Sequence, residues 1–275
     1  MSSKLSSNIP MPLKYTRVSF PSPEIMLVMI NRPQKLNSLP AEGSYELDSL
    51  FRWYDNEATL LVAILSGVGH AFCVGADLKE WAANQKNGSP LDLPANGFGG
   101  ISLRHGKKPI IAAVNGSAYG GGCEMVVNCD LVIASASATF ALPEVKRGVV
   151  AMAGSLPRLM RTLGRQRATE LTLTGRTVTA QEFRDWGICN LVVEQGASVV
   201  DEAIRVAKSI AENSPDAVIV TREGLKLGWE ALGAGDASRV YLDGWVKRIY
   251  QGDNIQEGLT AFEEKRSPRW KSSRL

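Results

Sequence analysis

The feature that most limits the possible folds is a set of short apolar runs that alternate with helical patterns. The runs are rich in Val and Ile and bounded by Gly, Pro or Asn, which is typical of buried strands; they cover residues 25–30, 60–66, 110–115 and 131–135. Between them, apolar residues recur at three- and four-residue steps over residues 41–55, 123–129 and 166–173. Strands that alternate with helices predict an α/β fold.

The part of the chain after about residue 198 has helical patterns and no strand pattern. Helices are predicted over residues 201–213, 217–232, 237–251 and 254–265. We therefore divide the 275 residues into a flexible leader (1–14), an α/β core (15–198) and a helical C-terminal region (199–275). The aromatic helix over 237–251 either forms an oligomer interface or packs on its own core. Residues 86–100, rich in Asn, Gly and Pro, are expected to form a loop over a site.

Composition excludes several classes of protein. Hydrophobic residues make up 44% of the chain, enough to bury a sizeable core, which excludes a disordered or fibrous chain. The net charge of +3 is too small to predict a nucleic-acid-binding surface. The four cysteines form no CxxC pair, so reduced thiols in an intracellular protein are expected. No apolar run approaches the roughly 18 residues of a membrane span, and the N-terminal segment lacks a signal-peptide core.

The most informative stretch for chemistry is residues 108–159. An apolar strand runs into Asn115-Gly116, and three glycines at 120–122 then precede a predicted helix. Glycines allow another group to approach the backbone, and a helix start presents unpaired N–H groups to a developing negative charge. Glu124 lies on the first turn of that helix and Glu144 follows twenty residues later. Brought together, they could serve as an acid/base pair; apart, they are a helix-dipole partner and a loop carboxylate, and spacing alone leaves both interpretations open.

A second glycine site, Gly75-Ala76-Asp77 with Lys79 nearby, follows an apolar strand and indicates a turn that opens a helix. Several other sites are disfavoured. The glycines do not spell GxGxxG, and neither a P-loop nor a Gly-x-Ser-x-Gly elbow is present. The two histidines, His70 and His105, sit in no Cys/His cluster, so no metal site is predicted.

Several segments, in a fixed order, resemble the enoyl-CoA hydratase/isomerase (crotonase) family over nearly the whole chain. They are Asn31-Arg32-Pro33 with Asn37-Ser38-Leu39, AFCVGADLKE (71–80), KPIIAAVNGSAYGGGCE (108–124), Cys129-Asp130, FALPEVKRGV (140–149), LTLTGRTVTAQEFRDWGICNLVV (171–193) and AFEEKR (261–266). The resemblance implies an α/β crotonase (ClpP-like) spiral of repeated β-β-α units with a helical C-terminal region. It also implies a homo-oligomer, either a trimer or a dimer of trimers.

The resemblance further implies which residues carry the chemistry. In this family the carbonyl of a CoA thioester becomes an enolate-like oxyanion, stabilised by two backbone N–H groups, here those of Ala76 and Gly121. Glu124 would orient and deprotonate the water that attacks Cβ, and Glu144 would deliver a proton to Cα. Both glutamates favour an enoyl-CoA hydratase or 3-hydroxyacyl-CoA dehydratase over the alternative, a Δ3-Δ2-enoyl-CoA isomerase. They also disfavour a non-catalytic CoA-binding protein. A CoA-thioester hydrolase, which would release a free thiol, is a further and less favoured alternative.

Coenzyme A belongs to the substrate, so no separate cofactor is expected. The resemblance places the substrate near the backbone of Val74, Asp77, Leu78, Lys79 and Gly120. The phosphates are expected at Lys35, or at Lys265 and Arg266 of a neighbouring subunit; a solvated basic helix end is the other interpretation of the latter two.

One departure from the family pattern concerns the acyl group. Where hydratases read Pro-Gly-Ala-Gly-Gly after the second glutamate, this chain has AMAGS at 151–155. Met152 thus replaces a glycine that lines the water site. Together with the loop at 86–100, it favours a branched or hydroxylated acyl group over a simple straight chain.

The chain ends in Ser273-Arg274-Leu275, a conservative variant of the Ser-Lys-Leu peroxisomal address. We therefore expect a peroxisomal location, with the import receptor as a partner that recognises this tripeptide. Fatty-acid metabolism in that compartment is consistent with chemistry on CoA thioesters.

Overall fold

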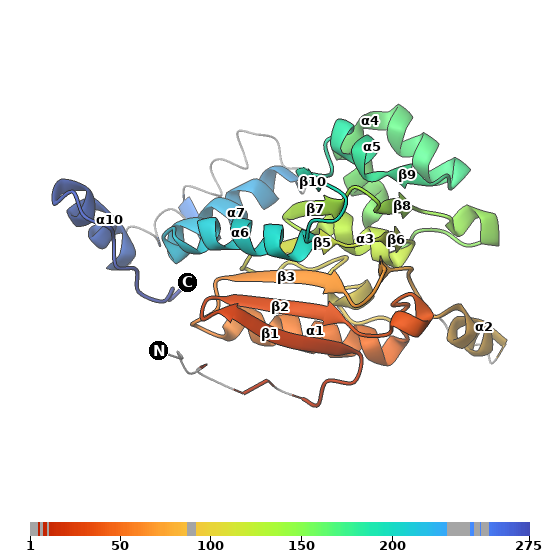
Figure 1. Cartoon of the computed structure of the whole chain (residues 1–275), viewed down its shortest axis with the longest axis horizontal. Coiled ribbons are helices and arrows are strands. Elements are labelled where there is room, and N and C mark those ends of the chain that lie inside the picture. Colours follow the sequence, from red (N-terminus) through yellow and green to blue (C-terminus); the bar gives the residue numbers. More distant parts are fainter. Residues whose placement is uncertain are drawn as a thin grey trace.

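Two β-sheets organise the chain, as the computed structural model in Figure 1 shows; it describes residues 5, 8–9, 11–86, 92–229, 243–244, 248 and 253–275. The larger sheet has six strands, in spatial order β1 (Thr16–Ser22), β2 (Ile25–Ile30), β3 (Val62–Gly67), β5 (Ile110–Val114), β7 (Leu131–Ser135) and β10 (Leu191–Val193). β1 and β2 are antiparallel, and the other neighbours in this sheet are parallel.

The smaller sheet is made of very short strands. In spatial order they are β4 (Ala71–Cys73), β6 (Ser117–Tyr119), β8 (Thr139–Ala141) and β9 (Val178–Thr179). β4, β6 and β8 run parallel, and β9 is antiparallel to β8.

The chain visits the two sheets in turn, and this alternation makes a repeated β-β-α unit. In the described residues the unit occurs as β3–β4–α2 (Leu78–Lys86), β5–β6–α3 (Gly121–Asn128) and β7–β8–α4 (Ser155–Thr174). The spiral of β-β-α units predicted from the sequence is therefore confirmed. The short strands are each followed closely in sequence by a helix or a 3₁₀ turn: β4 by α2, β6 by α3, and β8 by a turn at residues 144–147.

The remaining helices cover the larger sheet or follow it in sequence. They are α1 (Ala41–Asn56), α5 (Ala180–Asp185), α6 (Val199–Ala211), α7 (Pro215–Trp229) and α10 (Asp253–Glu263), with three 3₁₀ turns, η1 (Pro33–Lys35), η2 (Phe98–Gly100) and η3 (Glu144–Arg147). Figure 1 places α10 at one end of the molecule, beyond α6 and α7, and α2 at the other end. The helical C-terminal region is thus confirmed where it is described.

Four strands of the larger sheet, β2, β3, β5 and β7, are buried on both faces: successive residues of a strand point to opposite sides, and both sides are covered. On one face, Ile64 and Ile111 pack with Ala203 and Ala207 of α6. On the other face, residues such as Leu65 pack within the main core, which includes the apolar side of α1. The strands therefore appear in the sequence as continuous apolar runs.

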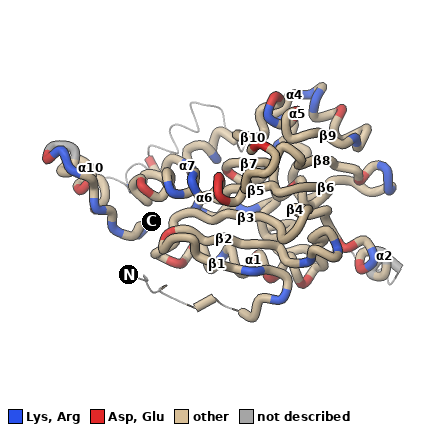
Figure 2. Tube along the Cα trace, in the orientation of Figure 1, with Lys and Arg blue, Asp and Glu red and all other residues tan. Residues whose placement is uncertain are grey.

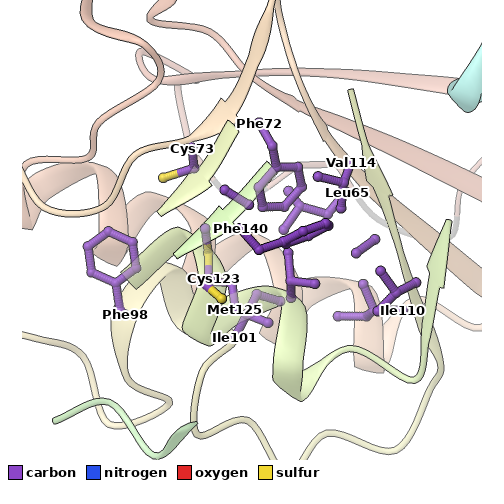
Figure 3. Close-up of a cluster of buried hydrophobic side chains, with 14 of the residues drawn as sticks. Leu65, Phe72, Cys73, Phe98, Ile101, Ile110, Val114, Cys123, Met125 and Phe140 are labelled. Atoms are coloured by element: carbon purple, nitrogen blue, oxygen red, sulfur yellow. The ribbon is translucent and has the colours of Figure 1, made fainter. Parts of the chain in front are cut away.

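The main core also supports the smaller sheet. Figure 3 shows Phe72 and Phe140 at the centre of this cluster, with Cys73, Cys123 and Phe98 on one side of them. The Phe72–Phe140 side of the core continues to α5, where the Phe183 ring stacks on Phe140 at a centroid distance of 4.2 Å. A packed core directly beneath β4 and α3 fixes the backbone of both segments.

Charged side chains are dispersed over the surface. Figure 2 shows Lys and Arg interspersed with Asp and Glu, for example on α4 and α10. No helix in the described ranges is both long enough and apolar enough to cross a membrane. Within the predicted leader, Leu5 and Ile9 pack against the core, and the backbone amide of Lys14 donates to Glu46 Oε2 at 2.7 Å.

One predicted helix is longer than expected. The pattern over 166–173 is only the second part of α4, which begins at Ser155. Pro157 in the first turn and Gly164, whose backbone lies at φ +73°, break the apolar periodicity of the first part. The helix predicted over 237–251 lies almost entirely outside the described residues, as do residues 87–91 of the predicted loop.

Candidate active site

Most of the predicted site residues lie around one cavity of about 290 Å³ between α2, α3 and the segment that follows η3. The predicted residues that line it are Val74, Ala76, Leu78, Gly120, Gly121, Glu124, Glu144 and Met152. They come from positions up to 78 apart in the chain, so it is the β-β-α spiral that brings them together.

Ala76 lines the cavity, and its amide takes no part in the backbone pairing next to it. Leu39 and Ala76 form an isolated parallel bridge, in which the Leu39 amide donates to Gly75 O and the Asp77 amide donates to Leu39 O, both at 2.9 Å. The bridge therefore uses the carbonyl group of the residue before Ala76 and the amide of the residue after it. The Ala76 N–H is therefore outside the bridge.

The first amide of α3 lies next to this segment. Gly75 has φ +95°, and a Cβ at that position would lie 3.0 Å from Tyr119 O and 3.2 Å from the Gly121 nitrogen. The two backbones are thus too close for a larger residue. Because the first amides of a helix have no partner within it, the Gly121 N–H is available at the positive end of the helix dipole.

Glu124 lies on the first turn of α3 and is only 4% exposed. Its Oε1 accepts hydrogen bonds from the Ala153 amide (3.0 Å), the Ser155 amide (3.4 Å) and the Ser155 hydroxyl (2.8 Å). Burial raises the pKa of Glu124, whereas these hydrogen bonds and the charge of Arg158 oppose the rise. The donors favour the ionised form of this carboxyl group.

Glu144 opens η3 on the other side of the cavity and has a different environment. Its Oε2 is buried and has no hydrogen-bond partner among the described residues. Burial raises the pKa of Glu144 to about 7, and the charge of Glu124 acts in the same direction, while Arg147 opposes it. Gly120, at φ +54°, leaves room for this carboxyl group, since a Cβ there would lie 3.1 Å from Glu144 Oε1. The two glutamates are therefore a pair in which Glu144 holds its proton to higher pH.

Comparison with known proteins agrees with this geometry. The family model described as enoyl-CoA hydratase/isomerase matches residues 22–273. The chain belongs to the enoyl-CoA hydratase/isomerase family. It is a hydro-lyase that adds water to, or removes it from, acyl-CoA thioesters.

Individual relatives cover almost the whole chain. A mevalonyl-coenzyme A hydratase of Aspergillus fumigatus is 48% identical over 258 residues, which are 94% of this chain and 95% of the relative. A mevalonyl-coenzyme A hydratase of Beauveria bassiana is 50% identical over 268 residues, 94% and 96% of the two chains. The crystal structure of an enoyl-CoA hydratase from Mycobacterium marinum superposes with a TM-score of 0.86 at 34% identity and covers 94% of this chain and 99% of that one.

Five residues predicted to bind the substrate do not line the cavity. Lys35 and Lys79 are exposed, and Lys265 is exposed just after α10. Asp77 accepts from Arg32 Nη2 at 3.1 Å and from the Lys79 amide at 3.2 Å, so it stabilises the start of α2. Arg266 is paired with Glu257 at 2.7 Å and with Glu264. For these residues, binding of the CoA moiety stays a prediction.

Sequence reasoning missed a larger part of the lining. The additional residues are mostly apolar and include two that bear hydroxyl groups: Leu36, Trp81, Leu93, Phe98, Ser117, Tyr119, Pro143, Arg147, Val149, Val150 and Ala153. It also missed Ser155, which holds Glu124 from the start of α4. A serine at a predicted helix start was the available signal, but the pattern over 166–173 placed that start too late.

In the described residues no group of three or more His, Cys, Asp or Glu side chains is arranged to hold a metal ion. The four cysteines are free thiols, and burial raises the pKa of each, to about 12 for Cys73. Glu124 and Glu144 are the two carboxyl groups that line the cavity within the described residues.

Proposed function

We propose that this hydratase acts on a branched, hydroxylated acyl-CoA of the mevalonyl type, with Glu124 and Glu144 as its catalytic pair. The observation that carries the proposal is the opposite environment of two carboxyl groups on one cavity. Glu124 is held by three donors on Oε1, whereas the buried Glu144 Oε2 has no partner within the described part of the chain. Such a pair supplies one ionised base and one protonated acid near neutral pH.

In the direction of hydration, the thioester carbonyl binds to the amides of Ala76 and Gly121. These groups stabilise the enolate-like oxygen that develops, and each contributes about 3 kcal/mol to the transition state. Glu124 accepts a proton from the water that attacks Cβ, and Glu144 donates its proton to Cα. Dehydration follows the same path in reverse, so no cofactor beyond the coenzyme A of the substrate is required.

The acyl specificity rests on the relatives and on the cavity lining. Two relatives at about half identity are named for mevalonyl-coenzyme A. The lining is mostly apolar, which suits a methyl branch, and it contains Ser117 and Tyr119 on one face of β6. Their hydroxyl groups meet at Thr139, with Tyr119 Oη 2.9 Å and Ser117 Oγ 3.4 Å from Thr139 Oγ1. A hydroxylated acyl chain finds hydrogen-bonding partners in this row.

The test follows product mass when the purified protein is incubated with mevalonyl-CoA, its dehydration product, crotonyl-CoA and 3-hydroxybutyryl-CoA. We expect a gain or loss of one water, fastest with the mevalonyl pair. Glu124→Gln and Glu144→Gln should each lower kcat by about 100- to 10,000-fold, because each removes a proton-transfer group. The exposed Glu194 provides the matched control, and Glu194→Gln should leave kcat unchanged.

Other results would redirect the proposal. A double bond that moves without a change in mass identifies an isomerase, and release of free CoA thiol identifies a hydrolase. A clear preference for crotonyl-CoA would contradict the acyl specificity alone. Hydration that survives both glutamine substitutions would contradict the assignment of the catalytic pair.

We also propose that the protein is a trimer or a dimer of trimers and that it is imported into peroxisomes. The helical C-terminal region supports the first point, and Ser273-Arg274-Leu275 supports the second. Light scattering measures the assembly, and a monomer would contradict it. A fluorescent protein fused before residue 1 should reach peroxisomes, and Leu275→Gly should leave it diffuse. Import of both forms would contradict the role of the tripeptide.

A further inference from the structure

A buried arginine lies behind the turn that holds Glu124. Arg158 is on the first turns of α4 and is only 7% exposed. Its Nη1 donates to Gly154 O at 2.9 Å and to Ser102 O at 3.3 Å. Its side chain therefore joins the start of α4 to the segment that follows η2.

Gly154 lies between the two residues that hold Glu124. The Ala153 amide precedes it, and the Ser155 amide and hydroxyl follow it; all three donate to Glu124 Oε1. Gly154 has φ +92°, and a Cβ there would overlap Leu103 and the Arg158 guanidinium. The turn is thus closely packed on Arg158, and its two flanking donors depend on its position.

The charge of Arg158 acts on the same carboxyl group. It lowers the pKa of Glu124, against the upward effect of burial. The other titratable groups near Glu124 are Glu144, across the cavity, and the buried Cys123. The positive charge that opposes the rise at Glu144 is that of Arg147, so each carboxyl group of the pair has its own arginine.

We propose that Arg158 is a positioning residue of the hydration reaction: its guanidinium clamps the Gly154 turn so that Ala153 and Ser155 hold Glu124 as the ionised base. The inference rests on the proposed role of Glu124. Arg158 acts through the turn and does not line the substrate cavity. A residue that served only to stabilise α4 would change the amount of folded protein and leave the ionisation of Glu124 as it is.

The first experiment compares the pH dependence of kcat/KM for hydration in Arg158→Met, Arg158→Lys and Arg161→Met. In the wild type the rate rises with pH as Glu124 ionises and falls as Glu144 loses its proton. Arg158→Met should lower kcat about 10- to 100-fold and move the rising limb to higher pH, because it removes donors and a positive charge. Arg158→Lys keeps the charge and should recover part of both effects. Arg161 is exposed on the same helix, and its substitution should change neither.

A double-mutant cycle separates positioning from stability. If Arg158 acts through the turn, Ser155→Ala should lower kcat/KM by a smaller factor in the Arg158→Met background than in the wild type. Melting temperature and folded fraction are measured for every variant. An activity loss that matches the unfolded fraction, with an unmoved rising limb and additive effects, would overturn the proposal.

A measurement without turnover keeps this inference distinct from the proposed function. Infrared difference spectra between acid and neutral pH, with the Glu124→Gln spectrum subtracted, report the ionisation of Glu124 directly. Arg158→Met should move that titration to higher pH whether or not the substrate has been identified correctly. An unchanged titration would overturn the positioning role, whereas hydration by the Glu124→Gln variant would overturn only the catalytic assignment.

Discussion

The cavity has two walls that are built in different ways. The inner wall, residues 71–76 and 117–124, consists of short strands and the start of α3, packed on the main core. The outer wall, residues 143–153, consists of η3 and an irregular segment in which Val150 is 57% and Met152 52% exposed. The inner wall presents backbone amides and Glu124, while the outer wall presents Glu144 and large apolar side chains.

This difference separates two requirements of the reaction. Stabilising an oxyanion requires donors that do not move, and a close-packed wall of glycines and small residues provides them. Accepting a particular acyl group requires side chains that can differ between enzymes without disturbing the core, and an exposed segment provides those. Substitutions on the inner wall should therefore affect folding and activity together. Substitutions on the outer wall, apart from Glu144 itself, should affect selectivity or pH dependence with little effect on folding.

The largest expected effect compares one glycine from each wall. In Gly122→Ala the new Cβ would overlap the backbone carbonyl of Cys73, so α3 must shift on the core. We expect a loss of about 3 kcal/mol in the free energy of unfolding, together with most of the activity. Gly148 lies at φ +69°, and a Cβ added there would meet no described atom within 4 Å. Gly148→Ala should therefore cost only about 1 kcal/mol of backbone strain.

Urea denaturation and kcat measured on the same preparations test this contrast. If the two alanine variants lost equal stability, the inner wall would not be the more rigid one. A fully active Gly122→Ala enzyme would show that the position of α3 is not critical for the oxyanion site.

The same contrast explains how much of the fold could be predicted from the sequence. β2 and β7 were predicted with their observed bounds, because strands buried on both faces form continuous apolar runs. The strands of the smaller sheet were not predicted, since two or three residues are too few to show a period. The start of α4 was missed because Pro157 and Gly164 interrupt its pattern.

The candidate site divides in a similar way. Glycine runs next to apolar strands drew attention to the inner wall, and family resemblance assigned roles there that spacing alone left open. The contacts of Glu124 with Ala153 and Ser155 span 29 and 31 positions and follow no periodicity, so no local pattern could indicate them. Arg158 was also missed, because a single sequence does not show that an arginine on a helix is buried.

An intermediate effect concerns the acid on the outer wall. Arg147 is exposed on η3 and lowers the pKa of Glu144, which burial raises to about 7. Without that positive charge the carboxylate is less stable, so in Arg147→Gln the pKa rises and Glu144 keeps its proton to higher pH. The falling limb of the hydration profile should therefore move to higher pH by less than one unit, because the charge is screened by solvent. The rising limb, which reports Glu124, should stay in place.

This pH profile is measured as kcat/KM beside that of Lys146→Gln, the control variant, which removes an exposed positive charge from the same turn. A falling limb that moves to lower pH in Arg147→Gln would contradict the sign of the interaction. If the falling limb moved equally in both variants, the effect would come from the general surface potential. The specific role given to Arg147 would then be wrong.

The smallest expected effect tests whether the outer wall selects the acyl group. Met152 lines the cavity and is half exposed, so Met152→Ala removes little buried surface and should change the melting temperature by no more than about 2 °C. The apolar contact with the acyl chain is worth about 1 kcal/mol. We therefore expect a several-fold loss in kcat/KM for the branched substrate and little change for crotonyl-CoA. Leu173→Ala, an exposed apolar position on α4 away from the cavity, is the control. An equal loss for both substrates would show that Met152 does not select the acyl group, and the distinction between the inner and the outer wall would fail at that residue.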